Sequence, residues 1–190
     1  MTKLIYTLFQ AALINNVVLM SFFGIRPLAT KSNTYQSVVQ MGLVVTGVMV
    51  VASILTWLVH TIILVPFRAE YLQIVFFTLT MIATVYLFDI GVNRRYPDYA
   101  NVWKTYRPFV YSNGLVLGVI VLNVQNQLGL MESVFSGLGG GLGFMLVMAI
   151  MVGIEERLDE AKIPRPFRGL PILFIAAGLL SLGFTVFSSF

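Results

Sequence analysis

Six long stretches of apolar residues, separated by short polar segments, follow one another along the chain. They cover residues 4–23, 38–65, 71–88, 109–124, 134–154 and 170–187. About 20 apolar residues in a helix cross the hydrocarbon core of a bilayer. The pattern therefore predicts an all-α membrane protein with six transmembrane helices.

Composition supports a lipid environment. Of the 190 residues, 58% are hydrophobic and 11% are charged, whereas soluble domains contain about 25% charged residues. A protein of this size has no core large enough to bury so many apolar side chains, so lipid must surround it. The basic residues form no face interleaved with aromatic residues, and nucleic acid is not an expected partner.

The distribution of positive charge predicts the orientation of the chain. Six spans place both termini on one side, where only Lys3 and Arg68 of the twelve Lys and Arg residues fall. The other ten fall in loops on the opposite side, and such residues accumulate in cytoplasmic loops. We therefore predict a multi-pass protein of the inner (cytoplasmic) membrane with both termini on the non-cytoplasmic side.

Polar and helix-breaking residues interrupt the first apolar stretch. Asn15 and Asn16 lie inside it, and Gly24, Arg26 and Pro27 follow before the next stretch begins. At membrane depth such residues cost free energy unless they line a protein interior or a cavity. The two asparagines therefore predict a discontinuous first helix beside a buried site.

Part of this pattern returns in the second half of the chain. In the segment 113–117, Asn113, Val116 and Leu117 match the asparagine, valine and leucine of the segment 15–19. A Pro-Phe-Arg motif then follows in both halves, at 66–68 and at 166–168, with nearly the same spacing. The matching order predicts an internal repeat.

The repeat defines the architecture of the single membrane domain, residues 1–190. Each half, about 1–92 and about 93–190, contains three predicted spans. Because an odd number of spans inverts the second copy, we predict two inverted three-helix repeats with discontinuous first and fourth helices. In transporters of this design the binding site lies near the middle of the membrane.

The candidate ion or substrate site consists of five residues of these motifs, each with a structural and a functional interpretation: Asn15, Asn16, Arg26, Asn113 and Gly114. The asparagines could cap broken helices, or their oxygen atoms could coordinate a cation. Arg26 could reach the cytoplasmic interface, or could be a fixed positive charge that binds an anionic substrate. No carboxylate accompanies these residues, so a tight divalent-metal site is not expected.

Two further patterns suggest packing and interfacial roles. The glycine-rich segment 137–143 favours close helix packing, and a hinge is the alternative. Four aromatic residues after the third stretch predict a belt at the membrane interface: Tyr96, Tyr99, Trp103 and Tyr106.

Several motifs make the chain similar to the Rnf/Nqr family of membrane subunits. They are Asn15-Asn16-x-Val18-Leu19 with Gly24-x-x-Pro27, Asn113-x-x-Val116-Leu117-Gly118-Val119, and Ile154-Glu155-Glu156-Arg157-Leu158 leading to Pro164-x-Pro166-Phe167-Arg168-Gly169. The chain most resembles the A subunit of Rnf and the E subunit of Nqr. This resemblance implies a subunit of a redox-driven Na⁺ or H⁺ pump. It also implies an inverted-topology homologous partner, together with flavin and iron–sulfur subunits.

The resemblance also implies a cofactor that the residues of this chain do not match. In the family, two cysteines from each of the paired subunits hold a [2Fe–2S] cluster, and the corresponding positions here are Arg26 and Gly114. The chain contains no cysteine. A guanidinium cannot replace a thiolate and glycine has no side chain, so we expect no cofactor held by this chain.

Three functions remain open from the sequence. The first is a structural or ion-pathway subunit of a Rnf/Nqr-type ion-translocating electron-transport complex. The second is a non-redox inverted-repeat transporter with Arg26 at a mid-membrane site, and the third is a scaffold for a membrane partner. No nucleophile–base pair and no phosphate-binding glycine loop is recognisable, so catalysis by this chain alone is not expected.

Overall fold

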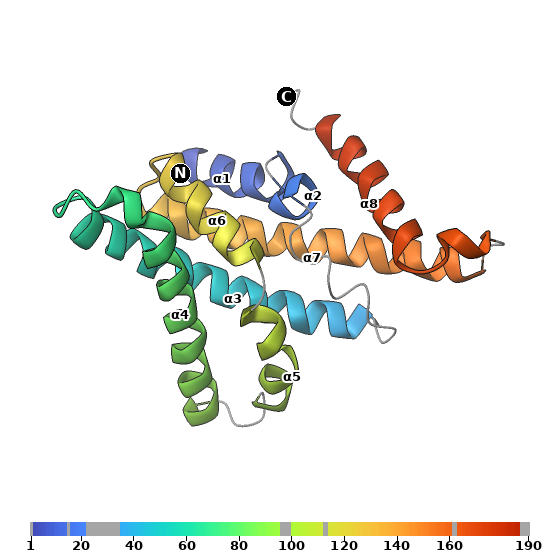
Figure 1. The fold of residues 1–190 in the computed structure, drawn as a ribbon, viewed down its shortest axis with the longest axis horizontal. Helices are drawn as coiled ribbons and strands as arrows, with labels where there is room; N and C mark the ends of the chain where they lie inside the picture. The colour runs from blue at the N-terminus through green and yellow to red at the C-terminus, as the bar shows by residue number, and fades with distance from the viewer. Residues whose placement is uncertain are drawn as a thin grey trace.

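The computed structural model describes residues 2–14, 16–21, 35–95, 100–111, 114–160 and 163–186, and all regular structure in these ranges is helical (Figure 1). The elements are α1 (Thr2–Phe9), the π-helix η1 (Gln10–Ile14), α2 (Val17–Ser21), α3 (Tyr35–Val59), the π-helix η3 (His60–Leu64), the 3₁₀-helix η4 (Glu70–Leu72), α4 (Gln73–Arg95), α5 (Ala100–Tyr111), α6 (Gly114–Gln125), α7 (Leu130–Glu160), the 3₁₀-helix η6 (Arg165–Phe167) and α8 (Leu170–Phe184). The prediction of an all-α protein is confirmed.

Several of these helices are apolar enough to span a membrane. Among the described residues, three continuous segments qualify by length and composition: Tyr35–Leu64, Glu70–Arg94 and Leu130–Leu158. The segments Trp103–Tyr111 and Gly114–Gln125 form a fourth candidate if the 58° bend between them lies within one span. Two shorter apolar helices are Lys3–Leu19 and Leu170–Phe184. The exact arrangement as six spans in inverted repeats stays a prediction.

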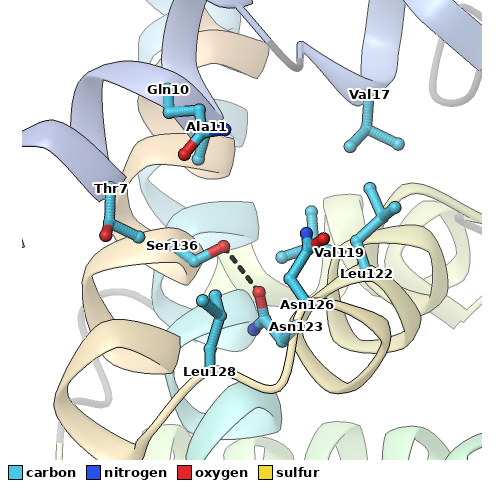
Figure 2. Close-up of a pocket in the computed structure, with 10 residues that line it drawn as sticks. All are labelled: Thr7, Gln10, Ala11, Val17, Val119, Leu122, Asn123, Asn126, Leu128 and Ser136. Atoms are coloured by element: carbon cyan, nitrogen blue, oxygen red, sulfur yellow. Dashed lines mark hydrogen bonds between the residues drawn. The ribbon is translucent and has the colours of Figure 1, made fainter.

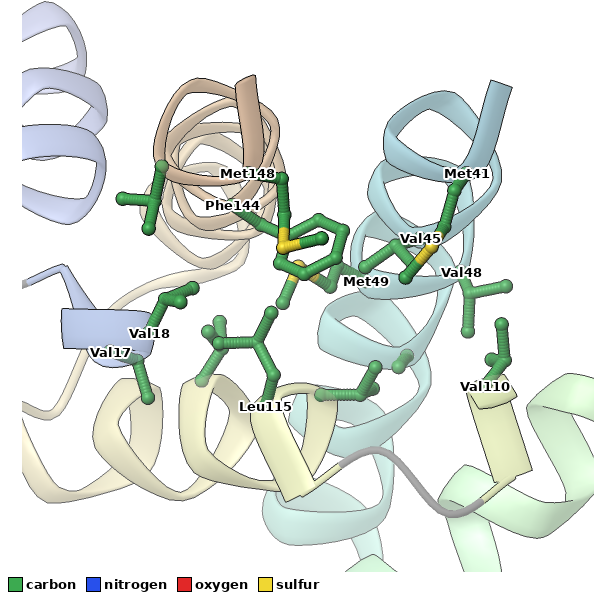
Figure 3. Packing of buried hydrophobic residues seen from close by; sticks show 14 of the residues in the cluster. Val17, Val18, Met41, Val45, Val48, Met49, Val110, Leu115, Phe144 and Met148 are labelled. Atoms are coloured by element: carbon green, nitrogen blue, oxygen red, sulfur yellow. The ribbon is translucent and has the colours of Figure 1, made fainter. Parts of the chain in front are cut away.

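The centre of the molecule is built on α7, which packs along α3 (Figure 1). The elements α1, η1 and α2 pack against α7 as well, and α6 contacts both α3 and α7. Buried side chains from several of these elements meet in one core, including Val18, Met49, Leu115 and Phe144 (Figure 3). The first and fourth predicted spans thus share a core with the second and fifth.

The glycines of α7 allow its neighbours to approach closely. A methyl group added at Gly139 would overlap the carbonyl oxygen of Leu8. One added at Gly143 would lie 2.6 Å from the carbonyl oxygen of Ala12, and Gly141 faces α3 in the same way. The helix continues unbroken through these residues. The prediction of close packing is confirmed, and the hinge alternative finds no support in the geometry.

Described helical segments end before, and begin after, the start of each asparagine motif. In the first half, η1 ends at Ile14 and α2 begins at Val17. In the second half, α5 ends at Tyr111 and α6 begins at Gly114. Residues 15, 112 and 113 lie outside the described residues, so the discontinuity of the first and fourth helices stays a prediction.

The prediction of an aromatic belt is wrong for Trp103. This residue is only 2% exposed, and its indole N–H donates a hydrogen bond to Asp89. The reason is that α5 already begins at Ala100 and packs against α4, so the indole faces a neighbouring helix. Tyr106 is partly buried against the core, and the remaining two tyrosines of the motif, at 96 and 99, lie outside the described residues.

Candidate functional site

Asn16 joins the two helical segments on either side of the first break. This residue is 2% exposed. The amide Nδ2 donates to the carbonyl oxygen of Ala12 at 2.8 Å, and Oδ1 accepts from the backbone N–H of Val18 at 3.1 Å. One bond satisfies a carbonyl at the end of η1 and the other caps the first turn of α2. This geometry is that of the helix cap expected from the sequence.

The other candidate residues are placed only in part. Three of them lie outside the described residues: Asn15, Arg26 and Asn113. Gly114 is the first residue of α6 and is partly buried. The helices that follow the two motifs pack against each other, since α2 contacts α6. Cation coordination at these motifs stays a prediction.

A polar cavity of about 260 Å³ lies between the first helix, α6 and α7 (Figure 2). Its polar lining is made of Thr7, Gln10, Asn123, Asn126 and Ser136. The lining also includes two apolar residues at opposite ends of the cavity. Leu128 belongs to the connection between α6 and α7, and Val17 is the first residue of α2. None of the described lining residues is charged. The cavity thus extends from the α6–α7 connection to the first residue of α2.

Asn123 links three helices at the edge of this cavity. It is 4% exposed. Its Oδ1 accepts a 2.6 Å hydrogen bond from Ser136 Oγ of α7 (Figure 2), and its Nδ2 donates to Ser53 Oγ of α3 at 3.2 Å. Buried polar networks of this kind fix the relative position of the elements that they join. Asn123 therefore holds α3, α6 and α7 in register.

A second, smaller void also borders Asn123. It measures about 10 Å³, and the residues that line it include Ser53, Thr56 and Ser133. Thr56 is 1% exposed, and its hydroxyl has no hydrogen-bond partner among the described residues. A buried hydroxyl without a partner costs roughly 1–3 kcal/mol. The void is about large enough for a single water-sized guest.

The irregular helix η1 adds to the polar character of the cavity. Gln10 and Ala11 belong to this π-helical segment, and both line the cavity. Single π-helical turns inside α-helices occur frequently at functional sites. A second π-helical segment, η3, begins at His60, which is partly buried. Neither segment was predicted from the sequence.

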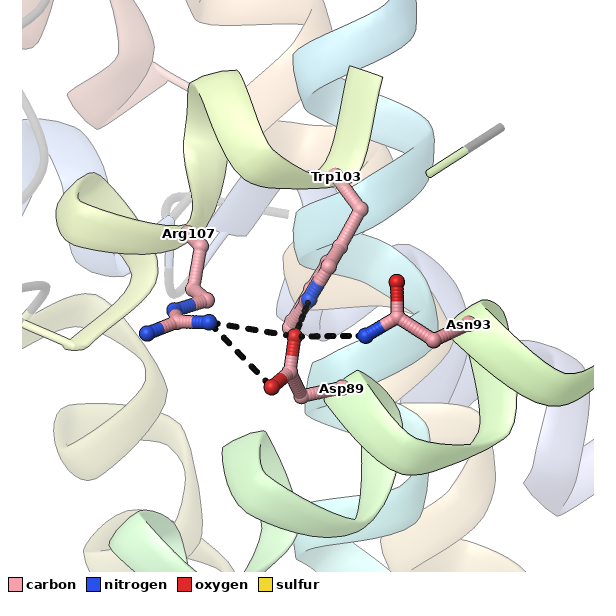
Figure 4. Close-up of polar contacts among 4 residues, drawn as sticks. All are labelled: Asp89, Asn93, Trp103 and Arg107. Atoms are coloured by element: carbon pink, nitrogen blue, oxygen red, sulfur yellow. Dashed lines mark hydrogen bonds and ion pairs between the residues drawn. The ribbon is translucent and has the colours of Figure 1, made fainter. Parts of the chain in front are cut away.

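Two ion pairs connect helices at other places. Asp89 Oδ1 accepts from the indole of Trp103 at 2.8 Å and from the amide of Asn93 at 3.3 Å, and the Arg107 guanidinium lies 3.2 Å from both carboxylate oxygens (Figure 4). This cluster holds α5 against α4, and both oxygens of the Asp89 carboxylate have partners in it. On the first helix, Lys3 forms a 2.6 Å ion pair with Glu132 of α7. Both clusters have a structural role.

The residues of the Asn123 network were not predicted from the sequence. Asn123 lies inside a predicted span, so the criterion that selected Asn16, a polar side chain at membrane depth, would also have selected it. Ser53, Thr56 and Ser136 carry a weaker signal, because small hydroxyl residues are common at helix contacts in membranes. Their proximity depends on the packing of three helices.

Known proteins resemble the chain over nearly its whole length. The family model described as Rnf-Nqr subunit, membrane protein, matches residues 4–190. The A subunit of the ion-translocating oxidoreductase complex of Azoarcus sp. (strain BH72) is 41% identical over 188 residues, 99% of this chain and 97% of the relative. The A subunit of the corresponding complex of Actinobacillus pleuropneumoniae serotype 5b (strain L20) is 38% identical, again covering 99% and 97%.

A third relative bears a more specific name. It is the A subunit of the Na(+)-translocating ferredoxin:NAD(+) oxidoreductase complex of Acetobacterium woodii, and it is 37% identical over 185 residues, 97% of this chain and 96% of the relative. The family match and these identities agree with the resemblance found in the sequence motifs. The chain belongs to the Rnf-Nqr family of membrane subunits.

Proposed function

We propose that the chain is an ion-pathway and structural subunit of an Rnf-type ion-translocating oxidoreductase complex. The observation that carries this proposal is the similarity, over nearly the full length of both chains, to the A subunits of such complexes. The polar cavity, whose lining includes Val17 next to Asn16, supports an ion-pathway role. The redox chemistry itself would belong to other subunits.

The proposed partners are a homologous membrane protein of inverted topology and the flavin and iron–sulfur subunits of the complex. Support comes from the names of the relatives, which describe their proteins as one subunit of a complex. The chain would therefore act inside an assembly rather than alone.

We also propose that both termini face the non-cytoplasmic side of the inner membrane. The ion pair between Lys3 and Glu132 joins two segments that the charge distribution assigns to that side. The ion pair between Asp89 and Arg107 joins two segments assigned to the cytoplasmic side. Leu128 lines the cavity and lies four residues before Glu132, in the connection that the charge distribution assigns to the non-cytoplasmic side. The cavity would therefore open toward that side.

The [2Fe–2S] cluster implied by the resemblance does not fit the residues of this chain. The chain has no cysteine, and Gly114, at one of the two implied ligand positions, begins α6 without a side chain. We propose that ligation by the family pattern is lost. The same observation favours a second candidate function, a non-redox inverted-repeat transporter with Arg26 at its mid-membrane site.

Purification of the tagged chain from its own membranes separates the two candidates. We expect the inverted homologue and flavin-containing subunits to co-purify in mild detergent, as identified by mass spectrometry. A chain that purifies alone or as a homo-oligomer would contradict the proposal and favour the transporter. Iron analysis of a subcomplex of this chain and its homologue should find no cluster, and stoichiometric iron there would refute the loss of ligation.

A further inference from the structure

We propose that the two Pro-Phe-Arg turns, residues 66–68 and 166–168, each bind the phosphate group of one phospholipid, so that the chain holds one lipid in each leaflet of its membrane. Neither turn has a part in the proposed ion pathway. The inference therefore goes beyond the proposed function and does not rest on it.

The two turns lie at opposite ends of the long helices α3 and α7. The first turn follows α3 and η3 and leads into η4 and α4, whereas the second follows α7 and leads into α8 (Figure 1). Only residues 65–69 separate the candidate spans Tyr35–Leu64 and Glu70–Arg94, so the first turn stays at the membrane surface. The charge distribution assigns the two turns to opposite sides of the membrane. Each turn would thus lie among the headgroups of one leaflet.

Each turn presents an aromatic ring and a guanidinium group next to each other. Phe67 is 77% exposed and Phe167 is 49% exposed, and the arginines that follow them, Arg68 and Arg168, are exposed as well. Neither arginine forms an ion pair with an acidic residue in the described part of the chain. Arg168 Nε donates to the carbonyl oxygen of Ile163 at 3.2 Å, and its terminal amino groups can bind another acceptor. Arginine suits phosphate oxygens, and aromatic rings favour the membrane interface.

The exposed faces of the two following helices match in register. Exposed apolar residues of α4 and α8 form four pairs whose members are 100 positions apart: Ile74 and Phe174, Val75 and Ile175, Leu79 and Leu179, Ile82 and Leu182. Phe77 and Ala177, separated by the same distance along the chain, are both buried. The two turns are also 100 positions apart. Each turn is therefore followed by an equivalent apolar surface, which suits the acyl chains of a lipid.

Arg68 indicates an anionic partner on the non-cytoplasmic side. Basic residues are rare on that side, where the only other one is Lys3, which pairs with Glu132. Arg68 also has a φ of 50°, in the left-handed region that residues other than glycine uncommonly adopt. Phospholipid is the anionic amphiphile that meets the chain at both membrane surfaces. A partner protein would have to offer the same chemistry at two opposite surfaces.

Native mass spectrometry of the purified protein, with the subunits that remain bound to it, counts bound lipids during a titration with phosphatidylglycerol. We expect Arg68→Asn and Arg168→Gln each to weaken one binding event by about five-fold, and the double variant to weaken both. The matched control is Arg157→Gln, since Arg157 is exposed on α7 but has no aromatic neighbour in the sequence. Equal binding by the wild type and the double variant would refute the sites.

Diacylglycerol, which has the acyl chains without the phosphate, identifies the group that is recognised. Its binding should be the same in the wild type and in all variants, and an equal loss for both lipids would refute phosphate recognition. Without added phospholipid, Arg68→Asn should melt at or above the temperature of the wild type, because asparagine adopts the left-handed region more readily. A lower melting temperature would show that Arg68 has a partner within the protein, which contradicts the proposal.

Photo-crosslinking in intact membranes distinguishes a lipid from a protein as the occupant. Replacement of Phe67 or Phe167 by p-benzoylphenylalanine keeps an aromatic side chain in each turn. We expect adducts with phospholipid at both positions. Adducts with another subunit would refute the lipid sites and support membership of a complex. Phospholipid adducts on a chain that purifies alone would support the lipid sites and refute the proposed function.

Discussion

Gly139→Ala is expected to destabilise the protein by about 1–3 kcal/mol or more, because the added methyl group has no room. It would overlap the carbonyl oxygen of Leu8, which belongs to the backbone of α1 and cannot rotate away. Either α1 must move away from α7 or the region must unfold. The melting temperature of the purified chain in detergent measures the effect.

Gly183→Ala is the matched control for this substitution. Gly183 lies in α8, and no atom is found within 4 Å of the position that its added methyl group would occupy. Alanine also favours a helix over glycine by up to about 1 kcal/mol, so the melting temperature should stay the same or rise. If Gly139→Ala behaved like this control, α1 would not pack on α7 as described.

Asn16→Leu is expected to cause the other large loss. Leucine would leave the carbonyl of Ala12 and the N–H of Val18 without their partners in a buried place, and each unpaired group costs about 1–3 kcal/mol. The combined effect of about 2–6 kcal/mol would be measured as a lower melting temperature and as a lower amount of folded protein in the membrane.

Asn93→Leu provides the comparison for the loss of an asparagine. Asn93 is exposed, and its amide makes one long hydrogen bond of 3.3 Å to Asp89, which keeps its contacts with Trp103 and Arg107. We expect little change in the melting temperature. An Asn16→Leu protein as stable as this control would show that Asn16 does not cap the break.

The sequence was most informative where one residue type has one physical consequence. Asparagine inside an apolar stretch indicates freed backbone groups, and Asn16 does bond to two of them. Glycines in a membrane helix indicate close neighbours, and Gly139 and Gly143 face the backbone of α1 and η1. Both inferences depend on local chemistry and need no knowledge of the tertiary structure.

Features that depend on distant partners were not predictable. In the sequence, Trp103 has the pattern of an interfacial residue. In the structure, α5 positions its indole N–H to donate a hydrogen bond to Asp89, fourteen positions earlier in the chain. The unpaired state of Thr56 follows from the positions of α3, α6 and α7 together. The π-helical segment η1, which packs against α7, also left no recognisable pattern in the sequence.

Redox-driven ion uptake into inverted membrane vesicles is the decisive test of whether the chain is an ion-pathway subunit of an Rnf-type complex. Vesicles would be prepared from cells with the gene deleted and from the same cells complemented with the wild type. Electron transfer through the complex would be started with a reduced donor and an oxidised acceptor while ²²Na⁺ uptake and internal pH are followed. We predict that uptake is lost on deletion and restored by the wild-type chain. Equal uptake with and without the chain would contradict this role.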